Sequence, residues 1–278
     1  MNSGTIIIAA HNEEAVIGRT LDALHDGLSG NSLRVIVVCN GCTDRTAQIA
    51  RGRAGVVVAD LSVASKTAAL REGDRQAGSG PRIYLDADVV LTRRAAQEVI
   101  DALSNGAIAA RPPREFDSRR ATWIVRSWYR VRADLPSIST ALWGAGCYAL
   151  SVAGRARFGL FPDIVSDDLF IDSLFSSNEV TIVATDPVIV TTPRRTSDLL
   201  RILRRSYRTQ SEITADVRIV STGQREQIGD LWSLLRRSPV RVGDVIVYVT
   251  VIAIGRVRAR ALGKNERWER DLSSRQLD

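Results

Sequence analysis

Two aspartates one residue apart, Asp86 and Asp88, are the clearest candidates for chemistry in this chain. They follow the apolar run 83–85, and apolar residues resume at Val89. A buried strand of an α/β sheet has this pattern, because it is apolar while it crosses the core and polar where it emerges. Carboxylates at that point are hard ligands for a divalent cation and acceptors for sugar hydroxyls. The pair predicts a ligand site at the carboxyl edge of a sheet, whereas an isolated Asp-x-Asp would be interpreted as a polar strand end.

The first half of the chain alternates apolar runs with amphipathic stretches, and this rhythm predicts the elements that hold the two aspartates. Strands are expected at 5–10, 35–38, 56–58 and 83–85. Buried strands separated by helices predict a parallel sheet with right-handed crossovers. The sequence contains neither G-x-G-x-x-G nor G-x-x-x-x-G-K-[ST], so a dinucleotide site and a P-loop lose their main support.

Composition indicates a globular protein with anionic partners. Of 278 residues, 45% are hydrophobic and 25% are charged, which suits one large or two small domains with a core. The net charge of +7 rests almost wholly on arginine, since Lys66 and Lys264 are the only lysines, and it favours phosphorylated substrates, acidic lipids or nucleic acid. Three cysteines are too few for a disulfide framework, and Cys39-x-x-Cys42 alone is weak support for a redox or zinc site. No secretory signal pattern opens the chain, so we expect a cytoplasmic protein.

The second half is less regular. We expect a helix, a glycine-bearing loop that enters a strand, two further strands and a basic helix at 119–132, 143–150, 180–183, 188–190 and 197–209. No linker or internal repeat divides the chain. We therefore expect one domain in two halves, 1–111 and 112–215, followed by a helical appendage at 216–278.

Six stretches resemble, in sequence order, the characteristic segments of family 2 glycosyltransferases. They are 8–14 (similar to P-x-Y-N-E-E), 37–44 (V-V-D-D-G-S-T-D), 65–70 (G-K-x-x-A-L), 84–88 (D-x-D), 143–146 (the glycine-rich acceptor loop) and 166–169 (T-E-D-x-x-L). Ala10 and His11 stand in place of Pro and Tyr in the first segment, and Asp167 stands in place of Glu in the last. A single match of this kind is weak, whereas six in order at plausible spacing are specific.

The resemblance implies the glycosyltransferase A-type fold, a mostly parallel, Rossmann-like sheet flanked by helices, with a helical C-terminal appendage. Residues 1–111 would bind a nucleoside diphosphate sugar, and residues 112–215 would bind the acceptor and hold the catalytic base. It also implies an inverting transferase that moves one sugar to an acceptor hydroxyl and uses Mg²⁺ or Mn²⁺.

The site residues on the donor side follow from these matches and from the chemistry of a diphosphate leaving group, whose growing charge a divalent cation stabilises. Asp88 is the candidate for direct metal contact, and Asp86 would hold the ribose or the metal and its water. The residues assigned to the donor are Ala10, His11, Glu13, Asn40, Lys66, Asp86, Arg204, Arg205 and Arg208. Lys66 would add a point charge near the diphosphate, and a solvated surface lysine is the equally favoured alternative.

Asp168 is assigned as the general base, because a carboxylate within hydrogen-bond reach can take the proton of the attacking hydroxyl. Asp167 would support it or bind the acceptor. Adjacent acids repel each other, so one pKa is expected to rise toward a useful value. The alternative is that both residues cap a helix that begins at Leu169. Direct attack by the acceptor inverts the anomeric centre and needs no separate nucleophile.

The expected basic helix carries four arginines on one face, where the family often has Q-x-x-R-W. They are Arg201, Arg204, Arg205 and Arg208. The Trp is missing and the Gln is not recognisable, and the sequence has no pore-forming membrane helices, so we expect a non-processive enzyme. The arginines would steady the leaving diphosphate, or they form a solvated basic face.

The apolar stretch 245–254 is shorter than a membrane-spanning helix, which needs roughly 20 residues. Arginines flank it at Arg236, Arg237 and Arg241 and again at Arg256, Arg258 and Arg260. Such a helix would suit an anionic membrane surface and a lipid-linked acceptor at the inner face of the cell membrane. Packing on the catalytic domain, or on a second subunit of a homo-oligomer, is the slightly favoured alternative.

Three other functions agree with parts of the sequence. A sugar nucleotidyltransferase would need a glycine- and lysine-rich loop after the first strand, which residues 10–13 do not supply. A module for nucleic acid or acidic ligands would leave both acidic pairs unexplained, because they repel phosphate unless a cation intervenes; we therefore expect no nucleic-acid partner. A catalytically inactive nucleotide- or anion-binding relative is the remaining alternative.

Overall fold

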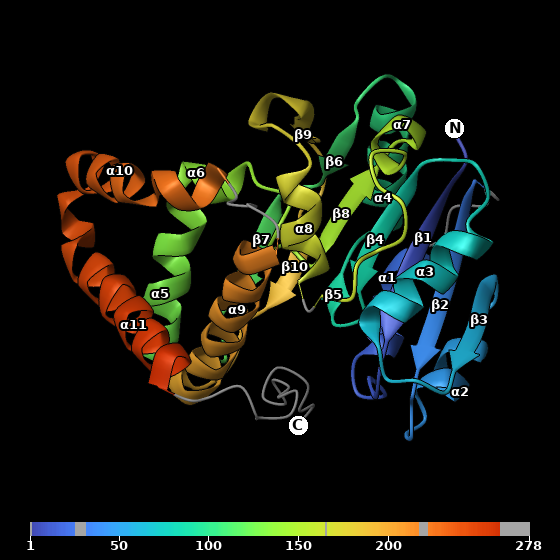
Figure 1. Ribbon diagram of the computed structural model, residues 1–278, viewed down its shortest axis with the longest axis horizontal. Coiled ribbons are helices and arrows are strands. Elements are labelled where there is room, and N and C mark those ends of the chain that lie inside the picture. The colour runs from blue at the N-terminus through green and yellow to red at the C-terminus, as the bar shows by residue number, and fades with distance from the viewer. Residues whose placement is uncertain (1, 26–31, 165, 217–221, 262–278) are drawn as a thin grey trace. The chain divides into compact units, whose positions relative to one another are not determined.

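The computed structural model describes residues 2–25, 32–164, 166–216 and 222–261 (Figure 1). Its strands are β1 (Gly4–Ala10), β2 (Leu33–Asn40), β3 (Val56–Leu61), β4 (Arg82–Asp86), β5 (Val89–Val90), β6 (Ala109–Arg111), β7 (Arg114–Asp117), β8 (Cys147–Leu150), β9 (Val180–Ile182) and β10 (Val188–Thr191). Its helices are α1 (Ile17–His25), α2 (Thr46–Arg51), α3 (Lys66–Gln76), α4 (Arg93–Ser104), α5 (Trp123–Asp134), α6 (Pro136–Ser139), α7 (Val152–Arg155), α8 (Asp167–Ser173), α9 (Thr196–Asp216), α10 (Thr222–Arg237) and α11 (Val242–Ala261). Two 3-10 helices are η1 (Ser177–Glu179) and η2 (Pro239–Arg241).

The main sheet has seven strands in the order β3-β2-β1-β4-β8-β6-β9. Strands β3, β2, β1 and β4 run parallel, whereas β8 is antiparallel to both β4 and β6. Parallel pairing brings strand ends together, so that Ala10 lies opposite Cys39 and Ala9 lies opposite Asp86. A smaller sheet has the order β5-β10-β7. The predicted mostly parallel α/β fold is confirmed, and the polar ends of its strands meet at one edge, where ligands bind in such sheets.

The four strands predicted in the first half are all present, each at its apolar run. The strands predicted at 180–183 and 188–190 and the basic helix predicted at 197–209 are also present, as β9, β10 and α9. The helix predicted at 119–132 begins later, at Trp123, because the preceding segment turns, with the Ala121 N–H donating to the Ser118 carbonyl oxygen (3.0 Å). The spacing of apolar residues therefore predicted where these strands and helices lie, and the turn before Trp123 sets the start of α5.

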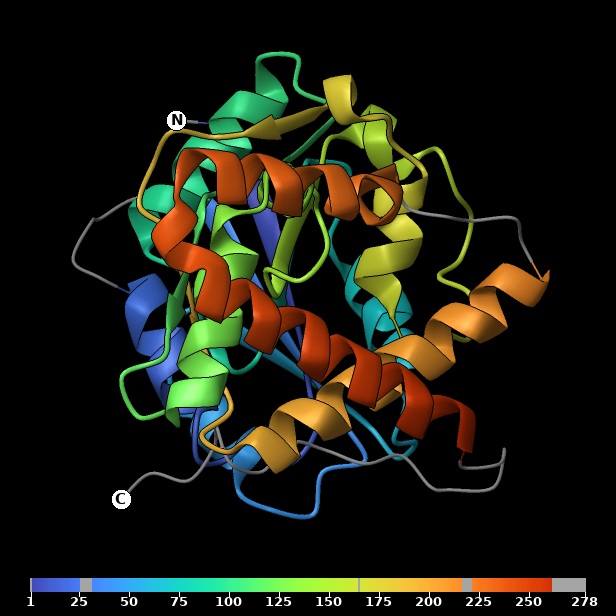
Figure 2. The ribbon, with the colours of Figure 1, turned by 90° about the vertical axis from the view of Figure 1, so that its left-hand side faces the viewer.

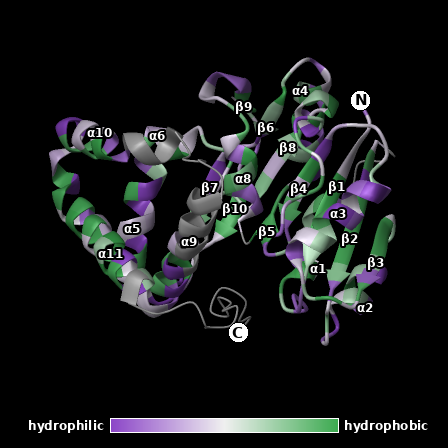
Figure 3. Ribbon diagram, in the orientation of Figure 1, coloured by the Kyte–Doolittle hydropathy of each residue, from purple (hydrophilic) through white to green (hydrophobic). Residues whose placement is uncertain are grey.

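Helix α3 packs closely on the main sheet, and this packing fixes the start of the helix near the strand ends. Its first turn is capped by Ser65, whose hydroxyl accepts from the Ala68 N–H (3.2 Å). Further along, a Cβ added to Gly73 would lie 2.3 Å from Ile7 Cγ2 on β1, so glycine is what allows the close approach. Figure 3 shows the apolar strands β1 and β2 beneath this helix. Lys66, the first residue of α3, is thereby held at the carboxyl edge of the sheet.

The chain divides into two compact units. Unit 1 comprises Met1–Glu115 and Leu142–Val190, and unit 2 comprises Phe116–Ala141 and Thr191–Asp278. Unit 1 contains the main sheet and its core, in which Ile6, Ile7 and Ile8 of β1 are fully buried. This is a division by packing, whereas the boundaries predicted after residues 111 and 215 divide the chain by function and stay predictions.

Unit 2 is mostly helical. Helix α11 packs on α5 and α9, and α10 packs on α6. Trp128 of α5 stacks on Tyr248 of α11 with ring centroids 5.4 Å apart, and Asp244 at the start of α11 accepts hydrogen bonds from Ser127 and Arg130. Within the described part of the chain, no helix has both the length and the apolarity to cross a membrane.

Replacing Gly73 tests the close packing of α3 on β1. Gly73→Ala should lower the free energy of unfolding by roughly 1–3 kcal/mol, because the new methyl group overpacks against Ile7. Gly229→Ala is the matched control, since a Cβ at this helical glycine meets nothing within 4 Å, and it should stabilise the protein by roughly 0.5–1 kcal/mol. Urea unfolding of both variants measures the difference. Equal effects of the two substitutions would contradict the close approach.

Candidate active site

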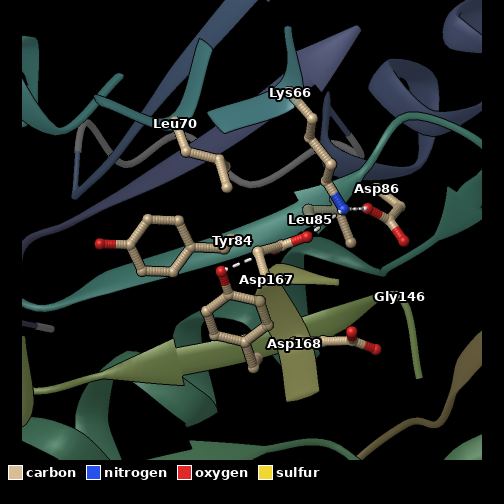
Figure 4. A pocket seen from close by; sticks show the side chains of 9 residues that line it. Lys66, Leu70, Tyr84, Leu85, Asp86, Gly146, Asp167 and Asp168 are labelled. Carbon is tan, nitrogen blue, oxygen red and sulfur yellow. Dashed lines mark hydrogen bonds and ion pairs between the residues drawn. The ribbon is translucent and has the colours of Figure 1, made fainter. Parts of the chain in front are cut away.

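A pocket in unit 1 opens where β4 ends (Figure 4). It is lined by residues of β4, β8, the loop before β8, and helices α3 and α8. Its lining residues are Lys66, Leu70, Tyr84, Leu85, Asp86, Gly146, Tyr148, Asp167 and Asp168. Of the pair Asp86 and Asp88, only Asp86 lines the pocket, whereas Asp167 and Asp168 both line it. Residues 81 or more positions apart along the chain thus meet in one pocket.

The Lys66 ammonium connects the two acidic groups. Its Nζ lies 2.7 Å from Asp86 Oδ1 and 2.8 Å from Asp167 Oδ1. Figure 4 shows the three side chains pointing toward one another. Burial lowers the pKa of Lys66, but the charges of Asp167 and Asp86 outweigh burial, and the net shift is upward. The ammonium is therefore charged across the physiological pH range.

Asp167 is the most enclosed carboxylate of the pocket, with a residue exposure of 2%. Besides the ion pair to Lys66, it accepts a hydrogen bond from the Tyr148 hydroxyl at Oδ2 (2.9 Å). Burial, followed by the charge of Asp167, raises the pKa of Tyr148 well above its usual value, so the phenol keeps its proton and stays a donor. Tyr148 also stacks on Tyr84, with ring centroids 4.9 Å apart. Asp167 is thereby held by one cation and one rigid aromatic donor.

Asp168 is half-buried and is oriented by backbone donors. The Gly144 N–H donates to Oδ2 and the Leu169 N–H donates to Oδ1, both at 2.9 Å. Burial raises the pKa of Asp168 to about 6, the neighbouring charge of Asp167 adds to the shift, and Lys66 opposes it. Helix α8 begins at Asp167 and not at Leu169, so the two acids occupy its first turn. The predicted rise of one pKa in this pair falls on Asp168.

Gly146 allows the loop before β8 to pass directly beside Asp86. The Asp86 N–H donates to the Gly146 carbonyl oxygen (2.8 Å), and Gly146 has a φ of +63°. A Cβ here would lie 2.7 Å from Val89 Cγ1 and 3.3 Å from Asp86 Oδ2. Any side chain at this position would therefore be strained and would crowd the carboxylate.

Asp88 lies outside this pocket's lining. It occupies the turn between β4 and β5 and is half-buried. The turn is fastened to α1, since Thr20 Oγ1 donates to the carbonyl oxygens of Ala87 (2.8 Å) and Val89 (2.9 Å). The structure thus brings Asp86, Asp167 and Asp168 together and leaves Asp88 two residues further along the strand end.

Four residues assigned to the donor lie where β1 and β2 end. Asn40 is buried, and its side-chain amide donates to the Ala10 carbonyl oxygen (2.9 Å). His11 Nδ1 is hydrogen-bonded to the Asn40 carbonyl oxygen. Glu13 is also buried, and its backbone N–H donates to Thr46 Oγ1 (2.7 Å). These residues form one group at the edge of the parallel sheet. Within it, the side-chain amide of Asn40 donates a hydrogen bond to the backbone of Ala10.

The arginines assigned to the leaving diphosphate belong to unit 2. Arg204 is half-buried on α9, and the side chains of Arg205 and Arg208 lie outside the described residues.

The carboxylates at the end of β4 fit a cation that is shared with a ligand. Among the described residues, no group of three or more His, Cys, Asp or Glu could hold a metal ion. Asp86 and Asp88 supply two oxygen donors, and Mg²⁺ sites commonly use one or two carboxylates with waters and substrate phosphates. The donor set therefore suits a cation whose shell is completed by a diphosphate.

Sequence reasoning missed two parts of the pocket. Tyr148 was expected only as a strand residue, and the Gly144 N–H only as part of a glycine-bearing loop. No local pattern marks either part, because the aromatic residues of 143–150 are only Trp143 and Tyr148, five positions apart, and alternate residues of a strand share a face.

Replacing Asp167 tests the electrostatics of the acidic pair. Asp167→Asn should lower the pKa of Asp168 from about 6, because it removes a neighbouring negative charge while Lys66 keeps its positive one. Asp163→Asn, at an aspartate whose side chain is 77% exposed and paired with Arg71, should leave that pKa unchanged. Titration of the aspartate carboxyl carbons by ¹³C NMR measures both. An unchanged Asp168 pKa in Asp167→Asn would contradict the coupling.

Comparisons with protein families and with solved structures identify the family and the fold. The family described as Glycosyl transferase family 2 matches residues 5–152. No curated protein matches the sequence. Among solved structures, the mannosyltransferase PcManGT from Pyrobaculum calidifontis, in complex with GDP-Man and Mn²⁺, has a TM-score of 0.59 at 18% identity, over 94% of this chain and 76% of that chain.

Two further structures are similar. Glucosyl-3-phosphoglycerate synthase from Mycobacterium tuberculosis, in complex with Mn²⁺, UDP and glucosyl-3-phosphoglycerate, has a TM-score of 0.55 at 16% identity, over 80% of this chain and 82% of that chain. TarS 1-349 from S. aureus has a TM-score of 0.51 at 14% identity, over 93% and 92% of the two chains. These likenesses show the glycosyltransferase A-type fold. The family match covers more than half of the sequence, and the chain belongs to glycosyl transferase family 2.

Proposed function

We propose that this enzyme transfers a single sugar from a nucleoside diphosphate sugar to an acceptor hydroxyl, with inversion at the anomeric carbon and without processive polymerisation. The single observation that carries the proposal is the pocket that Asp86 and Asp168 both line. A donor-side carboxylate and a carboxylate of raised pKa thereby face one small space. One-step transfer needs both groups close to the same anomeric carbon.

Asp168 is the general base in this proposal. A carboxylate with a pKa of about 6 is mostly ionised at pH 7 and is more basic than an ordinary aspartate, which suits removal of a proton from a hydroxyl. The N–H groups of Gly144 and Leu169 fix its plane and leave further lone pairs for the acceptor. The attacking oxygen loses its proton to Asp168 as it bonds to the anomeric carbon, and the diphosphate leaves from the opposite face.

Lys66 and Asp167 position the groups that act. The Lys66 ammonium sets a fixed positive charge beside Asp86, where negative charge grows on the departing diphosphate. Asp167 holds this ammonium on one side and raises the basicity of Asp168 on the other. Ala10, His11, Glu13 and Asn40 form the proposed nucleoside side of the donor site.

A divalent cation, Mg²⁺ or Mn²⁺, would be held by Asp88 and Asp86 and would stabilise the charge of the leaving diphosphate. Support comes from the two carboxylates at the strand end and from relatives of the same fold, which were solved with GDP-Man and Mn²⁺ or with UDP and Mn²⁺. The predicted contact of Arg204, Arg205 and Arg208 with the diphosphate stays a prediction.

The acceptor is proposed as a hydroxyl compound, and the lipid-linked acceptor raised by the sequence stays a prediction. The cytoplasmic localisation and the homo-oligomer expected from the sequence stay predictions. A sugar nucleotidyltransferase is disfavoured by the absence of a glycine- and lysine-rich loop after β1. A catalytically inactive relative would bind nucleotide without turnover.

Nucleotide binding tests the donor site. With Mn²⁺ present, one nucleoside diphosphate among UDP, GDP, ADP and CDP should raise the melting temperature by roughly 5–10 °C at about a hundredfold excess over its Kd. The shift should vanish in EDTA and shrink in Asp86→Asn and Asp88→Asn. Asp22→Asn, at an exposed aspartate paired with Arg53, is the control. A full shift in Asp88→Asn would remove the metal assignment of that residue.

The pH profile tests the general base. Because Asp168 must be ionised to accept a proton, kcat/KM should rise tenfold per pH unit up to about pH 6 and then level off. Asp168→Asn should abolish this limb and slow transfer by roughly 10²–10⁴-fold. Release of nucleoside diphosphate from a panel of UDP- and GDP-sugars measures both. A profile that stays flat through pH 6 in the active enzyme would exclude Asp168 as the base.

A further inference from the structure

The outward side of α10 and α11 carries an unusual number of exposed apolar side chains. Figures 1 and 2 show these two helices as the outer layer of unit 2, with α6 behind α10 and α5 behind α11. The exposed large apolar residues here are Ile228, Trp232, Val240, Val242, Ile246, Val249, Ile254 and Val257. We call this set the α10–α11 face.

Helix α11 is apolar over much of its circumference. Val245, Tyr248 and Val251 point inward and are buried. Val242, Ile246 and Val249, at i, i+4 and i+7, form a second stripe that adjoins the buried one, and they are 51%, 61% and 48% exposed. A surface helix normally has one apolar side, and a helix that is apolar all round is normally covered all round. The second stripe therefore indicates a surface that something else covers.

Helix α10 and the connection to α11 extend the stripe. Ile228 and Trp232 are one helical turn apart and are 73% and 64% exposed, and Val240 in η2 is 90% exposed. Arg236 follows Trp232 by another turn, so it lies on the same line along the helix. An exposed tryptophan beside arginine is typical of side chains that settle at a membrane–water interface.

Acidic side chains are scarce around this face, and exposed arginines are the more numerous charged residues. Between residues 227 and 261 the only acids are Asp230 and Asp244. Asp230 accepts from the Ser137 N–H (2.8 Å), and Asp244 is bound by Ser127 and Arg130. Arg236, Arg237, Arg256 and Arg258 are exposed, and none of them forms an ion pair within the described residues. Arg236 and Arg237 also line a pocket with Asp230 and Pro136, and the Arg256 guanidinium lies 5.6 Å from the ring centroid of Tyr207 on α9.

This charge pattern distinguishes between two occupants. A second copy of the chain would bring arginines against arginines across the interface, and like charges would oppose the apolar contact. An anionic bilayer offers an apolar layer beneath negative headgroups, and it matches both features at once. We propose that the α10–α11 face docks on the surface of an anionic lipid bilayer, with the valines, Ile246 and Trp232 in the headgroup region and the arginines against lipid phosphates.

Sedimentation of the full-length protein with lipid vesicles tests the proposal. The protein should pellet with vesicles of equimolar phosphatidylcholine and phosphatidylglycerol, should not pellet with phosphatidylcholine alone, and should be released by 0.5 M salt. Arg236→Glu combined with Arg237→Glu should weaken the partition coefficient roughly thirtyfold or more, which corresponds to about 1 kcal/mol for each lost arginine.

Two further variants distinguish docking through this face from nonspecific adsorption to vesicles. Ile246→Asp combined with Val249→Asp should abolish pelleting, whereas Leu160→Asp, at an apolar residue of unit 1 that is 74% exposed, should leave it unchanged. Circular dichroism should show the native spectrum for all variants, since the substituted side chains are exposed. The test does not depend on the donor or on turnover.

Three outcomes would overturn the proposal. These are failure to pellet with anionic vesicles at low salt, equal pelleting with neutral and anionic vesicles, and pelleting that the α11 double variant retains. A concentration-dependent dimer that Ile246→Asp and Val249→Asp dissociate, without vesicle binding by the parent protein, would assign the face to a second copy instead.

Discussion

The ion pairs of Lys66 are the contacts on which the pocket depends. Its ammonium lies between Asp86, at the end of β4, and Asp167, at the start of α8. Two carboxylates could not share this space at neutral pH without a cation, because their repulsion and desolvation would both disfavour the charged forms. The packing of α3 on β1 and β2, close at Gly73 and Ile7, holds the helix that carries Lys66 against the sheet.

The same arrangement gives the two acids of α8 different tasks. Asp167 is buried and held by Lys66 and Tyr148, and its negative charge raises the pKa of its neighbour. Asp168 is less enclosed and is oriented by backbone N–H groups alone, so it keeps access to the pocket. Environments that separate the behaviour of adjacent carboxylates are how proteins assign distinct acid–base roles to chemically identical groups.

Features encoded by local spacing were predictable from the sequence, whereas those that depend on distant contacts were not. The strand that ends at Asp86 and the acidic pair at α8 follow from short patterns of apolar and charged residues. Nothing local pairs Lys66 with Asp167, because they belong to α3 and α8, which are distant in the sequence. Tyr148 reaches that carboxylate from β8, which lies antiparallel beside β4. The grouping of residues 116–141 with the C-terminal helices is likewise set by packing on α11.

The central claim is that Lys66 and Asp167 act as one unit that joins the two acidic groups. A double-mutant cycle on the free energy of unfolding, with Lys66→Met, Asp167→Asn and the double variant, measures this most directly. The account predicts a coupling free energy above roughly 1 kcal/mol, because either substitution removes the Lys66–Asp167 attraction, and Lys66→Met leaves the buried Asp167 without its counter-charge. Effects that add to within about 0.5 kcal/mol, as for independent sites, would contradict it.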